Sequence, residues 1–394
     1  MNAKVSIVRG PKNPDEKHIR TMVQQAINLI GGIEDIISKG DRVLIKPNIA
    51  YEIKPGETEV SDPRVAKAVY DILSEMGAKP IIGESSASGV DGEAAFKASG
   101  YYELRDQGYE VVNLKKTKTV TLENPKANVL KKAKIYQLAN EVDAIVCLPV
   151  IKTHDNEPAT LSLKNMKGVM PDKEKKKFHH EYGLFQAIAD LNLIVKPALT
   201  IVDGIYCREG LGYPYSDEVE MDLVLAGKDP VAVDSVTLMI MGLNPKEQKH
   251  AILAEEHGIG TTDLSKIDVV GESIENVRRP FKTAQEALGE KFSLQDFNVI
   301  SSESMCTGCR GMIFYLFKYL EEMGKLDEIK DYTFVLGEQE SLPKIDKEKL
   351  ILIGLCTEQF KDFGRHVKGC PPLSSKVMSE VFKEDVKPSW ATDS

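Results

Sequence analysis

Short hydrophobic runs alternate with amphipathic stretches over the first 275 or so residues of the chain. The runs are mostly continuous, which is typical of strands that are covered on both faces. We therefore predict an α/β fold in which a mostly parallel or mixed sheet is flanked by helices. The expected strands span about 5–10, 41–48, 79–85, 109–114, 143–154, 197–205, 222–227 and 267–273, with a hairpin at 117–136. The expected helices span about 16–38, 63–77, 181–194, 229–241 and 245–257.

The stretch at residues 276–297 has no strong strand signal and reads as a connection between domains. A chain of 394 residues is long enough to bury a large core and to divide into domains. We predict a large α/β domain at 1–278, a linker at 279–290 and a smaller α/β domain at 291–394.

The predicted small domain contains four of the six cysteines, namely Cys306, Cys309, Cys356 and Cys370. The first two stand at the start of a predicted helix, where N–H groups and the helix dipole favour thiolate over thiol. Cys356 is expected to end a buried strand, and Cys370 lies in a stiff Gly-Cys-Pro-Pro turn. Four thiolates in one small segment predict a single metal centre.

The spacing of these cysteines indicates which type of metal centre they would form. It lacks the two close pairs of most zinc sites and the rapid succession of cysteines in bacterial ferredoxins. It resembles the way in which the small subunits of hydrogenases, and the related subunit of complex I, present a 4Fe–4S cluster. That resemblance implies one 4Fe–4S cluster, with zinc or no metal as alternatives. Of the other two cysteines, Cys147 is expected to pack as a small hydrophobe and Cys207 to be a lone loop thiol.

Polar side chains follow several of the predicted strands, and ligands of open α/β sheets bind outside the carboxyl ends of strands. The candidates at these ends are Lys46, Asn48, Glu84, Lys152, His154, Asp203 and Glu209. Lys152 and His154 are two residues apart, so they face the same side of an extended chain. There the lysine would neutralise an anion and the histidine would move a proton.

A second group of candidates follows in the segment TLSLKNMKG, which supplies Lys164, Asn165 and Lys167. Gly168 in the same segment would allow close approach of the backbone. The sequence does not decide whether the two lysines share a helical face.

The basic run at 172–180 ends in His179 and His180, one of which could be a further acid–base group or a metal ligand, and we assign His179 to that role. Such a run is more often a solvated loop than a phosphate-steering element. Structural roles are also expected elsewhere: Asp62 and Asp229 each precede a proline at a predicted helix start, so both should be N-caps.

Composition excludes several classes of protein. The net charge of −9, from 60 acidic and 51 basic residues, would repel nucleic acid. No stretch approaches the roughly 18 apolar residues of a membrane helix. Six cysteines are too few for a disulfide scaffold, so we expect a reducing, cytoplasmic location. The motifs GxGxxG, GxxxxGK[ST] and GxSxG are absent, which argues against dinucleotide, phosphate-loop and serine hydrolase sites of standard form.

Taken together, several motifs resemble the family known as domain of unknown function 362 over roughly residues 3–275. They are VLIKPN, the SDP helix start, LPVIKTH, LSLKNMKG, the histidine after the basic run, TIVDGI with a following EG, and LAGKDPVAVD. The resemblance implies an iron–sulfur-associated protein, often of anaerobes, in a family without an agreed reaction. Many relatives carry a ferredoxin-type insert where this chain has dispersed cysteines, and the family's EG is often followed by GP where this chain reads EGLGYPYS.

The sequence thus favours an iron–sulfur redox enzyme or electron-transfer protein that acts on a small carboxylate or phosphate, with a protein redox partner as a further option. In this interpretation the catalytic residues are Lys152, His154 and His179. The ligand would be bound by Lys46, Asn48, Glu84, Lys164, Asn165, Lys167, Asp203 and Glu209. Two alternatives stand beside it: a transferase, ligase or isomerase with a structural metal, and a protein that delivers clusters or electrons to another protein.

Overall fold

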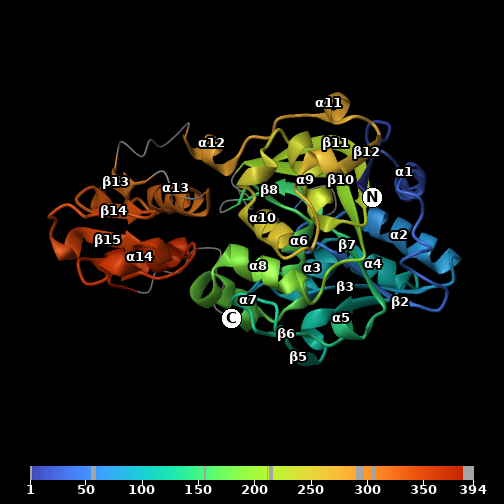
Figure 1. Cartoon of the computed structure of the whole chain (residues 1–394), viewed down its shortest axis with the longest axis horizontal. Helices are drawn as coiled ribbons and strands as arrows, with labels where there is room; N and C mark the ends of the chain where they lie inside the picture. The colour runs from blue at the N-terminus through green and yellow to red at the C-terminus, as the bar shows by residue number, and fades with distance from the viewer. Residues whose placement is uncertain are drawn as a thin grey trace.

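The computed structural model describes residues 2–54, 59–154, 157–210, 212, 216–289, 297–302, 305 and 307–384. Figure 1 shows a larger body that contains the N-terminal and central strands, and a smaller body with β13, β14, β15, α13 and α14. The predicted α/β class is confirmed, because both bodies are built from helices packed on sheets. No helix within the described ranges is long and apolar enough to cross a membrane.

The larger sheet has ten strands in the order β12-β1-β11-β10-β7-β2-β3-β4, and β8 pairs with β10 and β9. Its strands are β1 (Ala3–Arg9), β2 (Arg42–Pro47), β3 (Lys79–Glu84), β4 (Val111–Asn113), β7 (Ala144–Leu148), β8 (Val150–Thr153), β9 (Ala159–Thr160), β10 (Leu199–Gly210), β11 (Ser216–Gly227) and β12 (Ile267–Gly271). Strands β10, β7, β2, β3 and β4 are parallel neighbours, whereas β11 runs antiparallel to β10 and β1. The predicted hairpin forms a separate pair of strands, β5 (Thr119–Glu123) and β6 (Lys132–Tyr136).

Helices cover both faces of this sheet. They are α1 (Glu16–Leu29), α2 (Pro63–Glu75), α3 (Gly92–Ala98), α4 (Tyr101–Asp106), α5 (Leu138–Glu141), α6 (Ser162–Asn165), α7 (Asp172–Lys177), α8 (Leu184–Asn192), α9 (Pro230–Ile240), α10 (Lys249–Glu256) and α11 (Ile274–Val277). Successive residues of β2 point to opposite faces: Val43 and Ile45 pack in one cluster with α1 and α2, and Leu44 packs in another with α8. Burial on both faces explains the continuous hydrophobic runs.

Local signals decide where several elements begin and end. Asp62 and Asp229 accept hydrogen bonds from the first N–H groups of α2 and α9, as predicted for N-caps. The first helix is shorter than predicted, because Gly31 and Gly32 follow it with φ values of 94° and 80°.

Strand β10 is longer than predicted, since it continues through residues 205–210 beside β11. Asp203 therefore lies inside a strand and not at its end. Cys207 is buried in the same strand, so the prediction of a loop thiol is wrong.

The smaller sheet has four parallel strands in the order β13-β14-β15-β16. Its elements are β13 (Asn298–Ser301), β14 (Thr333–Leu336), β15 (Leu350–Ile353) and β16 (Arg365–Val367), with helices α12 (Ala284–Gly289), α13 (Thr307–Glu322) and α14 (Ser374–Phe382). Phe317 of α13 packs edge-on against Phe334 of β14, with 6.1 Å between ring centroids. These rings belong to a hydrophobic cluster separate from those of the larger sheet.

Candidate functional site

The strand order of the larger sheet reverses between β2 and β7. From β2 the chain adds β3 and β4 on one side, and from β7 it adds β10 and β11 on the other. Ligands of open α/β sheets bind outside the carboxyl ends of strands at such a reversal. Here Lys46 of β2 pairs in register with Cys147 of β7, so the polar residues after both strands meet at this point.

Lys46 is the centre of a buried polar network. Its side chain is fully buried and forms an ion pair with Glu84 at the end of β3. Its Nζ also donates to Oδ1 of Asn165 at 3.1 Å and to the carbonyl oxygen of Pro47 at 3.0 Å. Removing one partner of such a buried pair typically costs about 3–5 kcal/mol.

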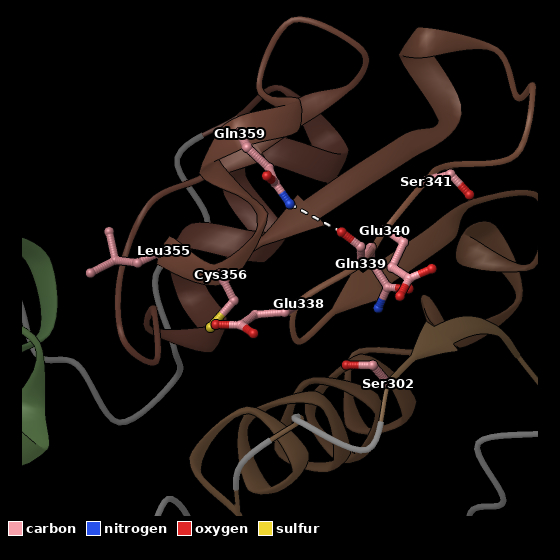
Figure 2. A pocket seen from close by; sticks show the side chains of 8 residues that line it. All are labelled: Ser302, Glu338, Gln339, Glu340, Ser341, Leu355, Cys356 and Gln359. Atoms are coloured by element: carbon pink, nitrogen blue, oxygen red, sulfur yellow. Dashed lines mark hydrogen bonds between the residues drawn. The ribbon is translucent and has the colours of Figure 1, made fainter.

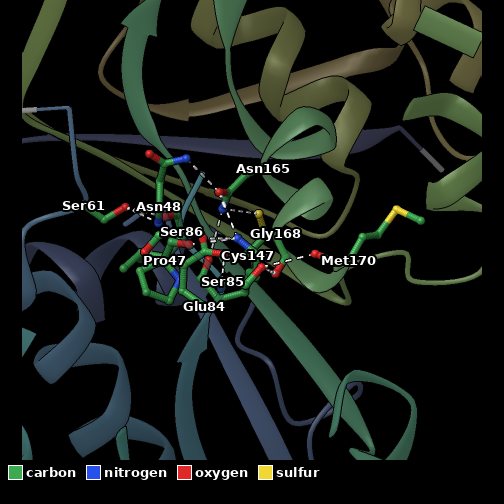
Figure 3. Close-up of polar contacts among 12 residues, drawn as sticks. Pro47, Asn48, Ser61, Glu84, Ser85, Ser86, Cys147, Asn165, Gly168 and Met170 are labelled. Carbon is green, nitrogen blue, oxygen red and sulfur yellow. Dashed lines mark hydrogen bonds and ion pairs between the residues drawn. The ribbon is translucent and has the colours of Figure 1, made fainter. Parts of the chain in front are cut away.

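Asn165 connects this ion pair to a second lysine through Asn48, and Figure 3 shows Asn48 and Asn165 close to Glu84. Oδ1 of Asn165 also accepts from Nδ2 of Asn48 at 3.1 Å, and Oδ1 of Asn48 accepts from Nζ of Lys152 at 3.0 Å. The structure thus brings five predicted ligand or catalytic residues into one chain of hydrogen bonds: Lys46, Asn48, Glu84, Lys152 and Asn165.

The amide nitrogen of Asn165 donates to the carbonyl oxygen of Lys46 at 3.1 Å and to Sγ of Cys147 at 3.3 Å. Burial raises the pKa of the Cys147 thiol to about 11, so it is protonated at neutral pH. This buried thiol packs among hydrophobic residues, as predicted.

Lys152 already has a carboxylate partner that sequence reasoning missed. Its Nζ lies 3.2 Å from Oε2 of Glu59 and donates to the carbonyl oxygen of Glu59 at 2.8 Å. Ser216 fixes the other carboxylate oxygen at 2.6 Å. Glu59 has a φ of 124°, a strained value for a residue other than glycine, and such strain often occurs at functional sites.

The segment after β9 is helical, so its two lysines lie on successive helical turns and not on an extended chain. Lys164 lies in α6 and Lys167 in the following turn, η2 (Met166–Val169). Nζ of Lys167 lies 5.2 Å from the ring centroid of Phe178. A Cβ atom at Gly168 would lie 2.0 Å from Oε1 of Glu84, so glycine is needed for this close approach, as predicted.

The basic run forms helix α7, and it is not simply a solvated loop. Lys175 is buried and donates to the carbonyl oxygens of Ser85 and Ser86, each at 2.8 Å. It also donates to the hydroxyl of Ser85 at 2.7 Å. Burial lowers the pKa of Lys175 to about 8. Helix α7 therefore packs against the loop that follows β3.

The predicted acid–base residue His179 lies in η3 (Phe178–Tyr182), which directly continues α7. Its carbonyl oxygen accepts from the backbone N–H of Cys370 at 3.1 Å. The carbonyl oxygen of Cys370 in turn accepts from the backbone N–H of Leu184 at 3.0 Å. Cys370 of the smaller body is therefore held against the end of the helix that begins beside Ser85.

Two other candidate cysteines lie near Cys370. Cys309 is in the first turn of α13, as predicted. Cys356 does not end strand β15 as predicted: the strand stops at Ile353, Gly354 turns the chain with a φ of 94°, and Cys356 lies in η9 (Leu355–Phe360).

Backbone contacts bring these cysteine segments together. The N–H of Leu355 donates to the carbonyl oxygen of Gly369 at 2.9 Å, which places the residues before Cys356 and Cys370 side by side. A Cβ atom at Gly354 would lie 3.7 Å from Sγ of Cys309.

These positions do not by themselves establish a metal centre. Cys306 lies outside the described residues, and among the described ones no three His, Cys, Asp or Glu side chains are grouped so as to hold a metal. The described cysteines form no disulfide bond with one another. The three described thiols, on neighbouring backbone segments, are the sulfur donors that a soft metal prefers. Because Cys306 lies outside the described residues, the four-cysteine centre stays a prediction.

A cavity of about 870 Å³ lies beside Cys356 (Figure 2). Its walls follow the carboxyl ends of β13, β14 and β15 and consist of Ser302, Glu338, Gln339, Glu340, Ser341, Leu355, Cys356 and Gln359. The Cys356 segment thus lines this cavity and also contacts the segment of Cys370.

The remaining predicted residues are Glu209, Asp203 and His154. Glu209 binds the guanidinium of Arg279 at 2.6 and 2.9 Å, which ties β10 to the chain that leads toward the smaller body. Asp203 accepts from the backbone N–H of Asp62 at 2.6 Å. Burial and the charge of Asp62 raise the pKa of Asp203 to about 7. His154 follows directly after β8 and is partly buried.

Residues 43–239, half of the chain, match the family described as Domain of unknown function (DUF362). The chain belongs to this family. The match confirms the resemblance inferred from the motifs. The DUF362 segment runs from β2 into α9 and includes the whole network from Lys46 to Lys175.

A curated relative, the Thylakoid-associated protein sll1697 of Synechocystis sp., is 29% identical over 250 residues, which cover 62% of this chain and 75% of the relative. Among solved structures, the lactate racemase apoprotein from Thermoanaerobacterium thermosaccharolyticum aligns with 91% of this chain and 71% of its own chain. That alignment has 12% identity and a TM-score of 0.37.

Proposed function

We propose that this DUF362 protein is a redox enzyme or electron-transfer protein with one 4Fe–4S cluster and a binding site for a small carboxylate or phosphate. The cluster ligands are Cys306, Cys309, Cys356 and Cys370. The anion site is the network at the carboxyl ends of β2, β3 and β8, together with the lysines of the segment that follows β9.

One observation carries the proposal: a single helical segment touches both centres. At one end Lys175 donates to Ser85 and Ser86, and at the other the carbonyl of His179 accepts from Cys370. The two residues are four positions apart in nearly continuous helix, a rise of about 6 Å. A cluster bound at Cys370 would therefore lie close to the anion site, as electron transfer between them requires.

The two centres have different tasks in this proposal. A bound cluster supplies one-electron chemistry. The chain's own residues hold the anion through lysine ammonium groups, and His154 or His179 moves a proton. The cavity beside Cys356 supports access of a redox partner to the cluster. A reducing, oxygen-poor cytoplasm belongs to the proposal, because thiolates and clusters persist there.

A pair of cysteine variants tests the cluster. Cys370→Ser, purified without oxygen, is expected to lose its iron while the larger body stays folded. Cys207→Ser is the matched control, because this thiol is buried in β10 among other side chains, and it is expected to keep full iron content. Full iron in Cys370→Ser would show that the four-cysteine assignment is wrong.

A third variant separates the two sites. Lys152→Ala is expected to retain iron but to lose binding of phosphate, because it removes the cation that Asn48 and Glu59 hold in place. Colourless wild-type protein with one zinc ion per chain would favour the alternative, a non-redox enzyme in which the metal only stabilises the smaller body.

A further inference from the structure

The ammonium group of Lys152 is surrounded by three oxygen atoms of the described chain. Its Nζ donates to Oδ1 of Asn48 at 3.0 Å and to the carbonyl oxygen of Glu59 at 2.8 Å. It also lies 3.2 Å from Oε2 of Glu59. An ammonium group carries three N–H donors, so its three oxygen neighbours match them in number. An external anion can therefore bind Lys152 only by replacing one of these oxygens.

Only one of the three oxygens is on a side chain that can leave easily. Asn48 is held by its amide nitrogen, which donates to Asn165 at 3.1 Å, and the carbonyl oxygen of Glu59 belongs to the main chain. The carboxylate of Glu59 is held, within the described ranges, by Lys152 and by the hydroxyl of Ser216 at 2.6 Å. Rotation of this one side chain would free both donors at once.

The place that this carboxylate occupies already has the features of an anion site. One oxygen lies beside the ammonium group of Lys152, and the other accepts from Ser216. Lys152 and Glu59 are buried, whereas Ser216 is partly exposed. Attraction between opposite charges is stronger in buried surroundings than in water. The two donors can therefore hold any carboxylate in the same bridging position.

The backbone of Glu59 also favours its release. The φ of 124° lies in a region that suits glycine and strains other residues. Such strain persists only while surrounding contacts hold it. The contacts of the carboxylate with Lys152 and Ser216 contribute to that hold. A ligand that takes over these two contacts would let the backbone relax.

The other buried lysine of the network is not arranged for such an exchange. Lys46 is also surrounded by oxygen atoms, and its carboxylate partner is Glu84. Oε1 of Glu84 accepts from the backbone N–H of Ser85 at 2.6 Å. A Cβ atom at Gly168 would lie only 2.0 Å from the same oxygen, so the carboxylate is closely packed. Lys152 is therefore the better candidate for the cation that a ligand reaches.

We propose that Glu59 is a built-in competitor of the ligand. Its carboxylate occupies the place of the ligand's carboxylate at Lys152 and Ser216, and binding exchanges one carboxylate for the other. No empty cavity is needed, because the incoming group takes the space of the outgoing one. This inference rests on the proposed anion site, and it names a carboxylate as the bound group and Glu59 as the residue that limits its affinity. A competitor that fills a site about 90% of the time lowers the apparent affinity about tenfold.

Titration of the full-length protein with acetate, followed by calorimetry or NMR, tests the exchange. Glu59→Gly removes the carboxylate, keeps the carbonyl oxygen that binds Lys152, and suits a φ of 124°. It is expected to bind acetate about tenfold or more tightly than wild type. Glu218→Gln is the matched control, because Glu218 is exposed in β11, two residues from Ser216, and its substitution also removes one negative charge. It should bind acetate as wild type does.

Stability gives a second readout. Without acetate, Glu59→Gly leaves the buried ammonium group of Lys152 without its counter-charge, which destabilises the fold. Acetate should therefore raise the melting temperature of Glu59→Gly more than that of wild type. Glu59→Gln keeps the shape of the side chain without its charge, so it should tighten acetate binding by a smaller factor. It decides the question if Glu59→Gly does not fold.

The outcomes separate this inference from the proposed function. In the double variant Glu59→Gly, Lys152→Ala the tighter binding should vanish, and tighter binding that survives there would overturn the inference. If wild type binds acetate or phosphate and neither Glu59 variant binds acetate more tightly, the inference is wrong and the anion site stands. Binding of neither anion to wild type or to either Glu59 variant would overturn both.

Discussion

The ammonium group of Lys175 donates a hydrogen bond to the carbonyl oxygen of Ser85 at 2.8 Å. Lys175 lies in a run of charged residues, and Ser85 lies directly after the buried strand β3. The contact fixes helix α7 against the carboxyl end of β3, and η3 then carries the chain to Cys370. The position of the candidate cluster ligand relative to the anion network therefore depends on this buried lysine.

Replacing this lysine should loosen the link between the two centres. Lys175→Met leaves the carbonyl oxygens of Ser85 and Ser86 without their donor, so the free energy of unfolding should fall by about 2–4 kcal/mol. Amide hydrogen exchange should also speed up over residues 172–184. Lys173→Met is the control, because Lys173 is exposed on the same helix and should change neither quantity. Unchanged exchange in Lys175→Met would contradict the anchoring role.

The close approach of Gly168 to the Lys46–Glu84 pair predicts a clash on adding one methyl group. A Cβ atom there would lie 2.6 Å from Nζ of Lys46 and 2.0 Å from Oε1 of Glu84. Gly168→Ala should therefore lower the free energy of unfolding by roughly 2–3 kcal/mol in urea denaturation. In a Glu84→Ala background the same change should cost less, since one clashing atom is gone. Purely additive effects of the two substitutions would show that the contact is not the cause.

The buried carboxyl group of Asp203 predicts a pH dependence of stability. Burial and the charge of Asp62 raise its pKa to about 7 in the folded protein, whereas an unfolded aspartate titrates near about 4. The folded state thus binds this proton more tightly. The resulting stability is fully present below about pH 4 and is lost as the pH rises through about 7.

Asp203→Asn removes this titration. The free energy of unfolding of wild type should fall relative to the variant by up to about 1.4 kcal/mol per pH unit between about pH 4 and 7. Urea denaturation across that range measures the difference. Asp234, which burial also gives a pKa of about 7, is present in both proteins and cancels in the comparison. Parallel pH profiles for the two proteins would refute the assignment.

Much of the fold follows from short-range pattern. Continuous hydrophobic runs indicated the buried parallel strands, and the Asp-Pro pairs indicated the starts of α2 and α9. The end of α1 was missed, because helix propensity over 30–38 concealed the effect of two glycines in positive φ. The length of β10 was missed because its second half is stabilised by pairing with β11, a contact that no local pattern records.

The site was predicted in part, for a similar reason. Lys46, Asn48, Glu84 and Lys152 were predicted because polar residues at strand ends face the ligand side of an open sheet, and Asn165 because it lies in the segment TLSLKNMKG. Glu59 stands in a polar stretch without a strand or helix signal. Such partners are set by tertiary packing, so only the structure identifies them.

The metal and redox state of protein purified without oxygen test the central claim most directly. The account predicts brown protein with about four iron atoms per chain. Its colour should bleach with dithionite, and the reduced form should give an electron paramagnetic resonance signal. Colourless protein that contains no iron under the same conditions would contradict it.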